Sequence, residues 1–339
     1  MEERLIQVAS FQKNVIKAML LLEETYVEVA TQRNEGGKPA LILCDRGVMD
    51  ASAYVDKETF ERLLTAVGID SVMQAKHDRY DLIIHLVSAA RGAEDHYSLE
   101  NNLARTESAD EARRVDERLL QAWTGHPHIV CINNRTQFKE KVVRALQAIC
   151  RRVGAPEVGD STVKRKFLVR QIREEAMKEI PYQDALCEYT YLQDGEDRQQ
   201  RLRKRQTEKT FVYTHVVRTK GLSGGYERYA ESSRNIPQRE YEALEAMSLP
   251  EHLSVQIIKR SFVHNSQYFS LAIFQNVHPG LMLLEFYEEA HVDVELPQHY
   301  LDIAEEVTSD PRFSMFNLSS KLSESPVAHQ QSLNSKTSE

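Results

Sequence analysis

The chain has 339 residues, of which 41% are hydrophobic and 28% charged, enough apolar material for about two domains with cores of their own. No run approaches the ~18 apolar residues that a membrane span needs, and the start, MEERLIQVASFQK, lacks the basic and apolar regions of a secretory signal. The net charge of −8 argues against a general nucleic-acid binder. The four cysteines show no CxxC or Cys/His spacing, which favours reduced thiols in the cytoplasm over disulfides.

The first 155 residues alternate helix-like and strand-like segments. Apolar positions three and four residues apart predict helices over 5–30, 107–123 and 137–150. Short apolar runs without polar alternation predict strands buried on both faces, at 40–44, 81–89 and 128–133. Because helical crossovers join parallel strands, we expect an α/β domain over residues 1–155. Its strand ends meet at one edge of a parallel sheet, where ligands bind.

A stretch rich in glycine and proline, RRVGAPEVGD, separates this half from a part with a period of two. The alternation predicts strands at 164–170, 201–206, 210–220, 254–263, 267–274 and 281–287. Helices are expected at 237–247 and near 299–307. We predict an α+β domain over 160–320, with a mostly antiparallel sheet curled on itself or closed into a barrel. A Ser-rich disordered tail is expected over 321–339.

Two charged residues directly follow the first buried run, in CDRGVMDASAY. A carboxylate at that place can hold the hydration shell of a nucleotide-bound Mg²⁺, so Asp45 is a candidate metal residue acting through water. Arg46 is a candidate for neutralising phosphate charge. The alternative is that Asp45 caps the next helix and that Arg46 forms a structural ion pair.

Arginines and an asparagine add to this predicted edge. Arg105 and Arg113 lie in a basic stretch that could close over phosphates, as the lid of nucleoside-phosphate kinases does. The alternative is a solvated helix with ion pairs three and four residues apart. Asn134 follows the third run, and it is either a contact to a base or ribose or a simple turn residue. The convergence of these residues favours a nucleotide site.

One element of a nucleotide site is missing from the sequence. A glycine-rich loop, GxxxxGK[ST], cradles phosphates with backbone N–H groups, and it occurs nowhere in the 339 residues. Gly36-Gly37-Lys38 enters a predicted strand instead of opening a helix after one. We therefore expect a truncated P-loop-type domain without its first strand and phosphate loop.

Several long motifs occur in order within residues 5–320: CDRGVMDASAYV, HLVSAARGAEDHYS, ARTESADEARRVDERLLQAWTGHPH, RLRKR, YTHVVR and EEVTSDPRFSMFNLS. Together they resemble the NadR/TRPL-translocation-defect AAA family, which joins a P-loop domain to a CYTH-like (triphosphate-tunnel) domain. Asp45 and Arg46 match its CDRG motif, and Arg105 matches its lid arginine. The resemblance implies binding of GTP with Mg²⁺, binding of a phosphoinositide headgroup, and a part in membrane-protein trafficking. It predicts a non-catalytic adaptor, cytoplasmic and peripheral to endomembranes, with a membrane-protein cargo and no nucleic-acid partner.

Arginines alternate along the run RLRKR. Because residues two apart in a strand share a face, Arg201, Arg203 and Arg205 are expected on one side. Lys259-Arg260 supplies another cation whichever of the two faces inward. Guanidinium groups match phosphate oxygens, whereas the alternative is a solvated edge strand whose charges prevent aggregation. The candidates for holding a phosphate or a headgroup are Lys166, Arg201, Arg203, Arg205, Arg218, Lys220, Arg260 and Glu285.

Glu285 interrupts an otherwise apolar strand, LMLLEFY. A buried carboxylate is costly unless it is paired, so we expect a partner among those arginines. CYTH enzymes carry an early ExExK strand whose glutamates bind metal for triphosphate hydrolysis, whereas here Lys164 and Lys166 stand at those places. The pattern favours a positively charged binding pocket. The competing hypothesis is an enzyme, either a CYTH-type triphosphatase or a small-molecule kinase.

Overall fold

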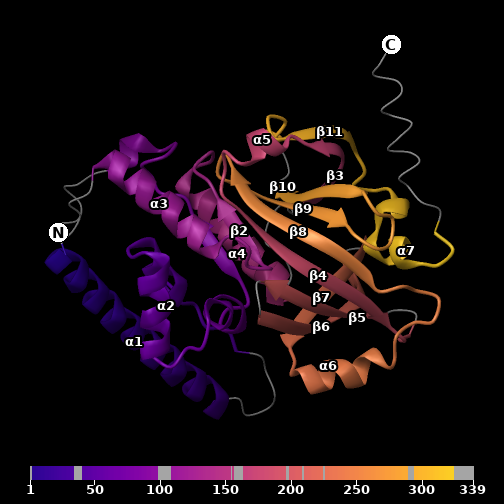
Figure 1. Cartoon of the computed structure of the whole chain (residues 1–339), viewed down its shortest axis with the longest axis horizontal. Coiled ribbons are helices and arrows are strands. Elements are labelled where there is room, and N and C mark those ends of the chain that lie inside the picture. The colour runs from indigo at the N-terminus through magenta and orange to yellow at the C-terminus, as the bar shows by residue number, and fades with distance from the viewer. Residues whose placement is uncertain are drawn as a thin grey trace.

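The computed structural model describes residues 2–33, 40–97, 108–153, 155, 163–195, 198–207, 210–223, 226–288 and 294–323. Two parts follow one another along the chain (Figure 1). Helices accompany a small parallel sheet in the first part, and a nine-stranded sheet forms the second. At this level the predicted fold class, a parallel α/β part followed by an antiparallel α+β part, is confirmed.

The described residues of the first part form helices and two short strands. The helices are α1 (Glu2–Gln32), α2 (Lys57–Ala66), α3 (Ala109–Trp123) and α4 (Phe138–Val153), and the strands are β1 (Ile83–Leu86) and β2 (Ile129–Ile132). Short 3-10 or π turns lie at Val48–Ala53, Gln74–Asp78 and Glu94–His96. A capping box starts α3, because Ser108 and Glu111 each accept the other's backbone N–H. The predicted helices and the second and third predicted strands are confirmed.

The first predicted strand, at 40–44, does not form. β1 pairs in parallel with β2, and these two strands make up the sheet in the described residues of this part. The segment 40–44 pairs with no strand, and its Leu41 and Leu43 are 57% and 71% exposed. An apolar run indicates a buried strand only where neighbours cover it, and no described strand covers this one.

Nine antiparallel strands build the second part. They are β3 (Val163–Ile172), β4 (Tyr182–Leu192), β5 (Arg198–Thr207), β6 (Thr210–Ser223), β7 (Tyr226–Asn235), β8 (Val255–His264), β9 (Gln267–Phe274), β10 (Met282–Glu288) and β11 (Leu301–Glu306). Their order across the sheet is β11-β3-β10-β9-β8-β4-β5-β6-β7. Short helices lie at its margins (Figure 1): α5 (Glu174–Met177), α6 (Gln238–Glu245) and α7 (Met315–Ser319). All strands predicted for this part are confirmed, whereas the sequence pattern does not predict β4, β7 or β11.

The helix expected near 299–307 is wrong. Residues Leu301–Glu306 form β11, an edge strand that pairs with β3. Leu301 is fully buried in an apolar cluster that includes Phe167 and Phe286. The sequence pattern of residues 301–306 fits either a helix or a strand, and pairing with the open edge of β3 makes it a strand.

Different partners bury the two faces of the large sheet. On the outer face, Phe262 and Phe269 belong to one apolar cluster with β11 and α5. The opposite face, called the inner face below, carries Cys187 and Leu283 in a cluster with Phe313 and Leu318 from the C-terminal segment. Elsewhere on this face Tyr268 packs against the core of the first part. The inner face is thus covered from both ends of the chain.

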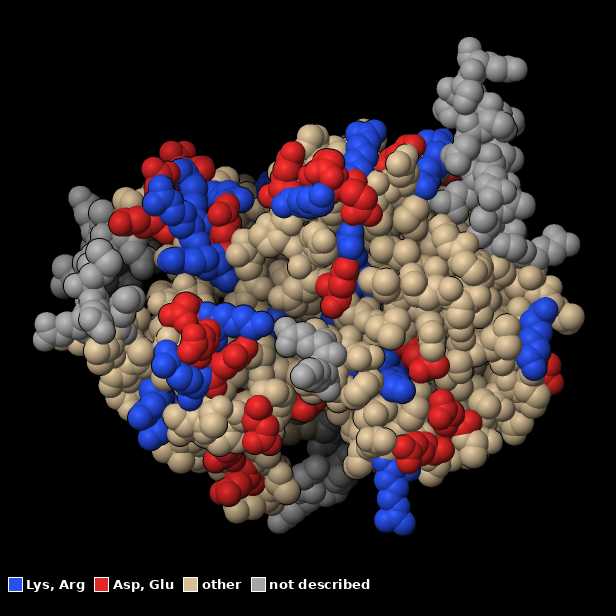
Figure 2. Space-filling model, viewed as in Figure 1, with Lys and Arg blue, Asp and Glu red and all other residues tan. Residues whose placement is uncertain are grey.

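The surface in view carries charges of both signs. Figure 2 shows Lys and Arg side chains next to Asp and Glu over the helices of the first part, with no large patch of one sign. No helix within the described ranges has the length and apolar character required to cross a bilayer.

Candidate functional site

Several of the described cations lie on the inner face of the large sheet. In antiparallel pairing, directly opposed residues share a face. Arg203 opposes Tyr189 and Arg205 opposes Cys187, while Lys259 opposes Ala185 on the other side of β4. The same rows place further cations there, which are Lys164 and Lys166 on β3 and Arg201 on β5. The alternation predicted for RLRKR therefore places its three arginines on one face, where the apolar cluster that includes Ala185 and Ala272 lies between them and the lysines of β3.

Glu285 pairs with lysines, which corrects the expectation of an arginine partner. Its carboxylate lies 2.8 Å from Lys164 Nζ and 3.6 Å from Lys166 Nζ. β10 is adjacent to β3 but four strands from β5, which is ~19 Å at ~4.8 Å per strand. Burial raises the pKa of Glu285, but the two lysines outweigh it and hold this pKa at about 2. Burial also lowers the pKa of Lys166, whereas Glu285 outweighs burial at Lys164 and raises its pKa.

The three arginines of β5 differ in how they are paired. Arg201 Nη2 lies 3.2 Å from Glu231 Oε2, and its guanidinium lies 5.8 Å from the Tyr189 ring centroid. Arg203 donates to the Thr214 hydroxyl at 3.3 Å, and Arg205 donates to the Gly125 carbonyl at 2.6 Å. In each of the three, the buried Nε–H has no acceptor among the described residues.

Three neighbouring cations lack a carboxylate partner. No described Asp or Glu lies within ion-pairing distance of Arg203, Arg205 or Lys259. Burial lowers the pKa of Arg203, and burial together with the two arginines lowers that of Lys259 to about 8. Positive charge is thus concentrated at a desolvated place where protein anions do not balance it.

The first part of the chain closes this face. Lys76 Nζ donates to the Thr124 carbonyl at 3.0 Å and to Gln183 Oε1 at 3.4 Å, so the turn 74–78 lies against β4. His128, at the start of β2, is influenced by Arg203 and Lys259. Burial and those cations keep its pKa well below 6.5, so the ring is neutral, and its buried Nε2 has no partner among the described atoms. Sequence reasoning missed His128 and Lys76 because they come from a distant part of the chain.

The prediction that Arg260 faces the proposed phosphate site is wrong, because its neighbour Lys259 takes that place. Arg260 points to the opposite face, where it donates to both Asp184 oxygens at 2.9 and 2.8 Å and lies 4.1 Å from the Tyr182 ring centroid. Strand alternation places one of the two residues inward, and the register selects Lys259. Arg218 opposes Gln199 and Glu231, so the register places it on the inner face with Arg201, although its side chain is exposed. The Lys220 side chain lies outside what the structure describes.

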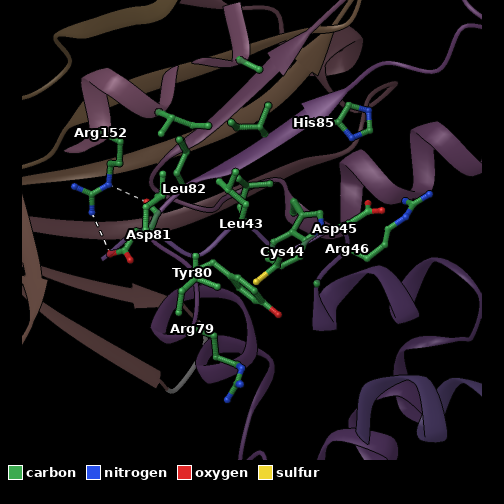
Figure 3. A pocket seen from close by; sticks show the side chains of 18 of the residues that line it. Leu43, Cys44, Asp45, Arg46, Arg79, Tyr80, Asp81, Leu82, His85 and Arg152 are labelled. Carbon is green, nitrogen blue, oxygen red and sulfur yellow. Dashed lines mark hydrogen bonds and ion pairs between the residues drawn. The ribbon is translucent and has the colours of Figure 1, made fainter. Parts of the chain in front are cut away.

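The predicted nucleotide edge lines a cavity of about 1540 Å³ (Figure 3), whose walls come mostly from the first part and also include Thr219 of β6 and Glu231 of β7. Asp45 and Arg46 belong to its lining. Arg46 Nη1 lies 3.8 Å from Asp50 Oδ2, the structural ion pair of the alternative interpretation. The cap predicted for Asp45 belongs instead to Asp50, whose carboxylate accepts the Gly47 N–H at 3.3 Å and the Trp123 Nε1–H at 2.6 Å.

The remaining predicted edge residues hold the protein's own backbone. Arg113 Nε donates to the Ala90 carbonyl at 2.6 Å. Asn134 Nδ2 donates to the Ser88 carbonyl at 2.7 Å and to the Arg91 carbonyl at 2.8 Å, and its amide oxygen accepts from Lys141. These contacts agree with the alternative interpretations, in which Arg113 and Asn134 stabilise the helix and the turn instead of binding a nucleotide. Arg105 lies outside the described residues.

The described residues do not fit a divalent metal on the inner face. Within those ranges no three His, Cys, Asp or Glu side chains gather closely enough to hold an ion. Glu285 lies on β10 beside β3 and is engaged by the two lysines of that strand. Hard cations require several oxygen ligands, so we derive no chemistry through a metal here. The role of Asp45 toward Mg²⁺ stays a prediction.

Comparison with known proteins places similarity in both parts. The AAA domain family matches residues 4–141, which supports an AAA-type, P-loop-like first part. Structures similar to the chain include the inorganic triphosphatase NE1496 (21% identity, 45% of this chain and 91% of that one, TM-score 0.33) and protein PH1819 from Pyrococcus horikoshii OT3 (14%, 40% and 80%, TM-score 0.29). A comparison with curated proteins finds no match.

These similarities bear unequally on the two hypotheses. An inorganic triphosphatase belongs to the enzyme class of the alternative hypothesis. Nothing in the matches supports GTP binding, phosphoinositide binding or protein transport. At TM-scores near 0.3 the structural likeness does not define an activity for this chain, so its function is argued from the inner face itself.

Proposed function

We propose that the inner face of the antiparallel sheet binds an anion with several phosphoryl groups. The observation that carries this proposal is the row of buried Nε–H donors without acceptors on Arg201, Arg203 and Arg205. A buried donor left unpaired costs about 1–3 kcal/mol, and phosphate oxygens are the acceptors that guanidinium groups match best. From Arg201 to Arg205 the strand spans ~13 Å at ~3.3 Å per residue, which suits a chain or ring of phosphates.

Binding is favoured over hydrolysis on this face. Triphosphate hydrolysis of the CYTH type depends on carboxylates that hold metal ions, and here lysines 164 and 166 engage Glu285. Inorganic triphosphate, GTP and a phosphoinositide headgroup share the chemistry that the cations recognise. The trafficking adaptor of the main hypothesis requires the headgroup, whereas the alternative enzyme requires turnover of a triphosphate.

Isothermal titration with sodium tripolyphosphate tests the proposal. Arg203→Ala removes a cation of the inner face, and Lys204→Ala is the matched control on the same strand because Lys204 points outward toward Glu188, 4.0 Å away. A hydrogen bond to a charged group contributes about 1.5–3 kcal/mol, so we expect affinity to fall about 10- to 100-fold in Arg203→Ala and to stay within about twofold in Lys204→Ala. Equal affinities in all three proteins would refute the site.

Three further ligands distinguish the sources of the phosphate chemistry. GTP and inositol 1,4,5-trisphosphate are titrated in the same way, and phosphatidylcholine vesicles with and without phosphatidylinositol 4,5-bisphosphate test the headgroup at a membrane. Release of phosphate from tripolyphosphate with Mg²⁺ or Mn²⁺ tests the enzyme. If Arg203→Ala loses phosphate release and Lys204→Ala retains it, the function of this face is hydrolysis and not binding alone.

A further inference from the structure

The imidazole of His128 lies where the first part of the chain meets the inner face of the large sheet. His128 directly precedes β2, and its carbonyl accepts the Ile83 N–H at 2.9 Å. Its own N–H donates to His126 Nδ1 at 3.1 Å, and His126 Nε2 lies 2.9 Å from the Tyr80 carbonyl. The two rings are 6.4 Å apart and inclined at 67°. Backbone contacts on both sides of His128 therefore fix the position of its ring.

Cations from three elements act on this ring. They are Arg203 of β5, Lys259 of β8 and Arg152 of α4. The other titratable neighbour is His126, which is neutral because burial lowers its pKa to about 3. No carboxylate in the described ranges lies within ion-pairing distance of His128. The ring is thus a base surrounded by positive charge that no nearby protein anion balances.

Unpaired polar atoms from both parts of the chain gather at this boundary. The buried Nε2 of His128 has no hydrogen-bond partner among the described atoms, and neither has the buried Nε of Arg203 or Arg205. The same is true of Nδ1 of His77, whose ring is stacked on His126 at 5.7 Å. Buried polar groups in folded proteins have partners as a rule. An anion would supply acceptors to the guanidinium groups and would balance the cations around the His128 ring.

We propose that His128 is a contact of the phosphate site, and that its ring takes up a proton from the solvent when the anion binds. The inference rests on the proposed function, because the anion is the one that Arg203 and Arg205 would hold. A bound polyphosphate brings several negative charges to the place where the cations now act alone, which favours the imidazolium over the neutral ring. Nε2–H of the imidazolium then donates a charge-assisted hydrogen bond to a phosphoryl oxygen.

A proton taken up on binding makes the affinity depend on pH. Because the His128 ring is neutral in the empty site and charged in the complex, its contribution to binding grows as the pH falls. One fully linked proton changes the dissociation constant about tenfold per pH unit. Two lysines of this boundary also gain protons on binding, since burial and Arg205 lower the pKa of Lys76 to about 7 and that of Lys259 to about 8. The share of His128 is therefore measured by difference.

Calorimetric titration of the wild type and His128→Gln with sodium tripolyphosphate measures this share. Titrations at pH 6.5 in two buffers that differ in their enthalpy of ionisation give the number of protons taken up, and the lysines and the ligand contribute equally in both proteins. We expect His128→Gln to take up at least about 0.5 proton fewer than the wild type. The ratio of wild-type affinity to His128→Gln affinity should rise at least about threefold from pH 7.5 to pH 6. His299→Gln, at an exposed histidine of the second part, is the control and should match the wild type at both pH values.

The outcomes separate this inference from the phosphate site. If tripolyphosphate binds and Arg203→Ala weakens it, but His128→Gln takes up as many protons as the wild type, the inference is wrong and the phosphate site stands. Proton uptake that is lost in His77→Gln instead also overturns it. If tripolyphosphate does not bind to the wild type, the proposed function itself fails. Urea denaturation shows whether His128→Gln folds, and the side-chain ¹⁵N chemical shifts of the wild type give a reading without any substitution: the absence of a ring that becomes an imidazolium at saturation refutes the inference.

Discussion

Replacing Glu285 by glutamine separates a phosphate-binding face from a metal-dependent one. The substitution keeps the shape of the side chain and removes its charge, leaving Lys164 and Lys166 without an anionic partner. In a face that binds phosphate by excess positive charge, the loss of this carboxylate strengthens binding. In a face that binds phosphate through a metal, the loss of a carboxylate ligand weakens it.

The structure sets the size of both effects. A carboxyl pKa of about 2 instead of 4.5 corresponds to at most about 3 kcal/mol in favour of the folded, charged form. Because the Glu285 side chain is 24% exposed, we expect Glu285→Gln to lose about 1–2 kcal/mol of the free energy of unfolding. Glu285 lies four strands, or ~19 Å, from β5, so removing its negative charge is worth about 0.9 kcal/mol to an anion bound there at an effective dielectric of about 20. Tripolyphosphate should therefore bind about fourfold more tightly.

Urea denaturation and titration calorimetry measure the two quantities. Since the folded pKa of Glu285 lies below its ordinary value, its contribution is complete above pH ~4.5 and is lost as pH falls toward 2. The stability difference between the wild type and Glu285→Gln should therefore be constant from pH 5 to 7 and shrink below pH 4.5. Weaker tripolyphosphate binding by Glu285→Gln, in buffer with or without Mg²⁺, would refute the reasoning and support a metal on this face.

Four further predictions concern the inner face and the first part of the chain. Burial and Arg205 lower the pKa of Lys259 to about 8, so stability should rise between pH 8 and 10.5. Lys259→Met should raise the free energy of unfolding at pH 7, measured by urea denaturation, by about 1–3 kcal/mol and should weaken tripolyphosphate binding; an unchanged free energy of unfolding would contradict this. Gly125→Ala should destabilise by about 2–4 kcal/mol, because φ is +91° and a Cβ would lie 2.3 Å from Gln183 Oε1. Gly68→Ala serves as the control, because Gly68 also has a positive φ of +83° but has open space around it. It therefore measures the cost of backbone strain alone, and its free energy of unfolding should fall by only about 1–2 kcal/mol. Asp50→Ala strands the Trp123 Nε1–H and should lower the unfolding free energy by about 1–3 kcal/mol, seen as a lower thermal midpoint.

Strand and helix patterns predicted most of the fold because burial on one face leaves a period in the sequence. Helix α4 and strand β5 are read from that period alone. The segments 40–44 and 301–306 failed for a shared reason: their structure depends on whether a neighbouring edge is present. β3 offers β11 an edge, and no described strand flanks 40–44 on either side.

The candidate site divides in the same way. The period of two placed Arg201, Arg203 and Arg205 on one face without any knowledge of the sheet. It could not choose between Lys259 and Arg260, because that choice depends on the register with β4. Nor could it pair Glu285 with lysines on an adjacent strand, or bring His128 against the sheet from another part of the chain.

The unpaired donors of β5 also explain why that site needs both parts of the chain. A strand with alternating arginines on a solvated edge would give each guanidinium to water at no cost. Here the loop that contains Gly125 covers Arg205, and the buried His128 lies close enough for Arg203 to lower its pKa. Water is thus excluded, and the buried Nε–H groups of the arginines find no acceptor among the described residues. Closing the face thus raises the free energy of the empty site, and the same enclosure strengthens every contact that an incoming phosphate makes.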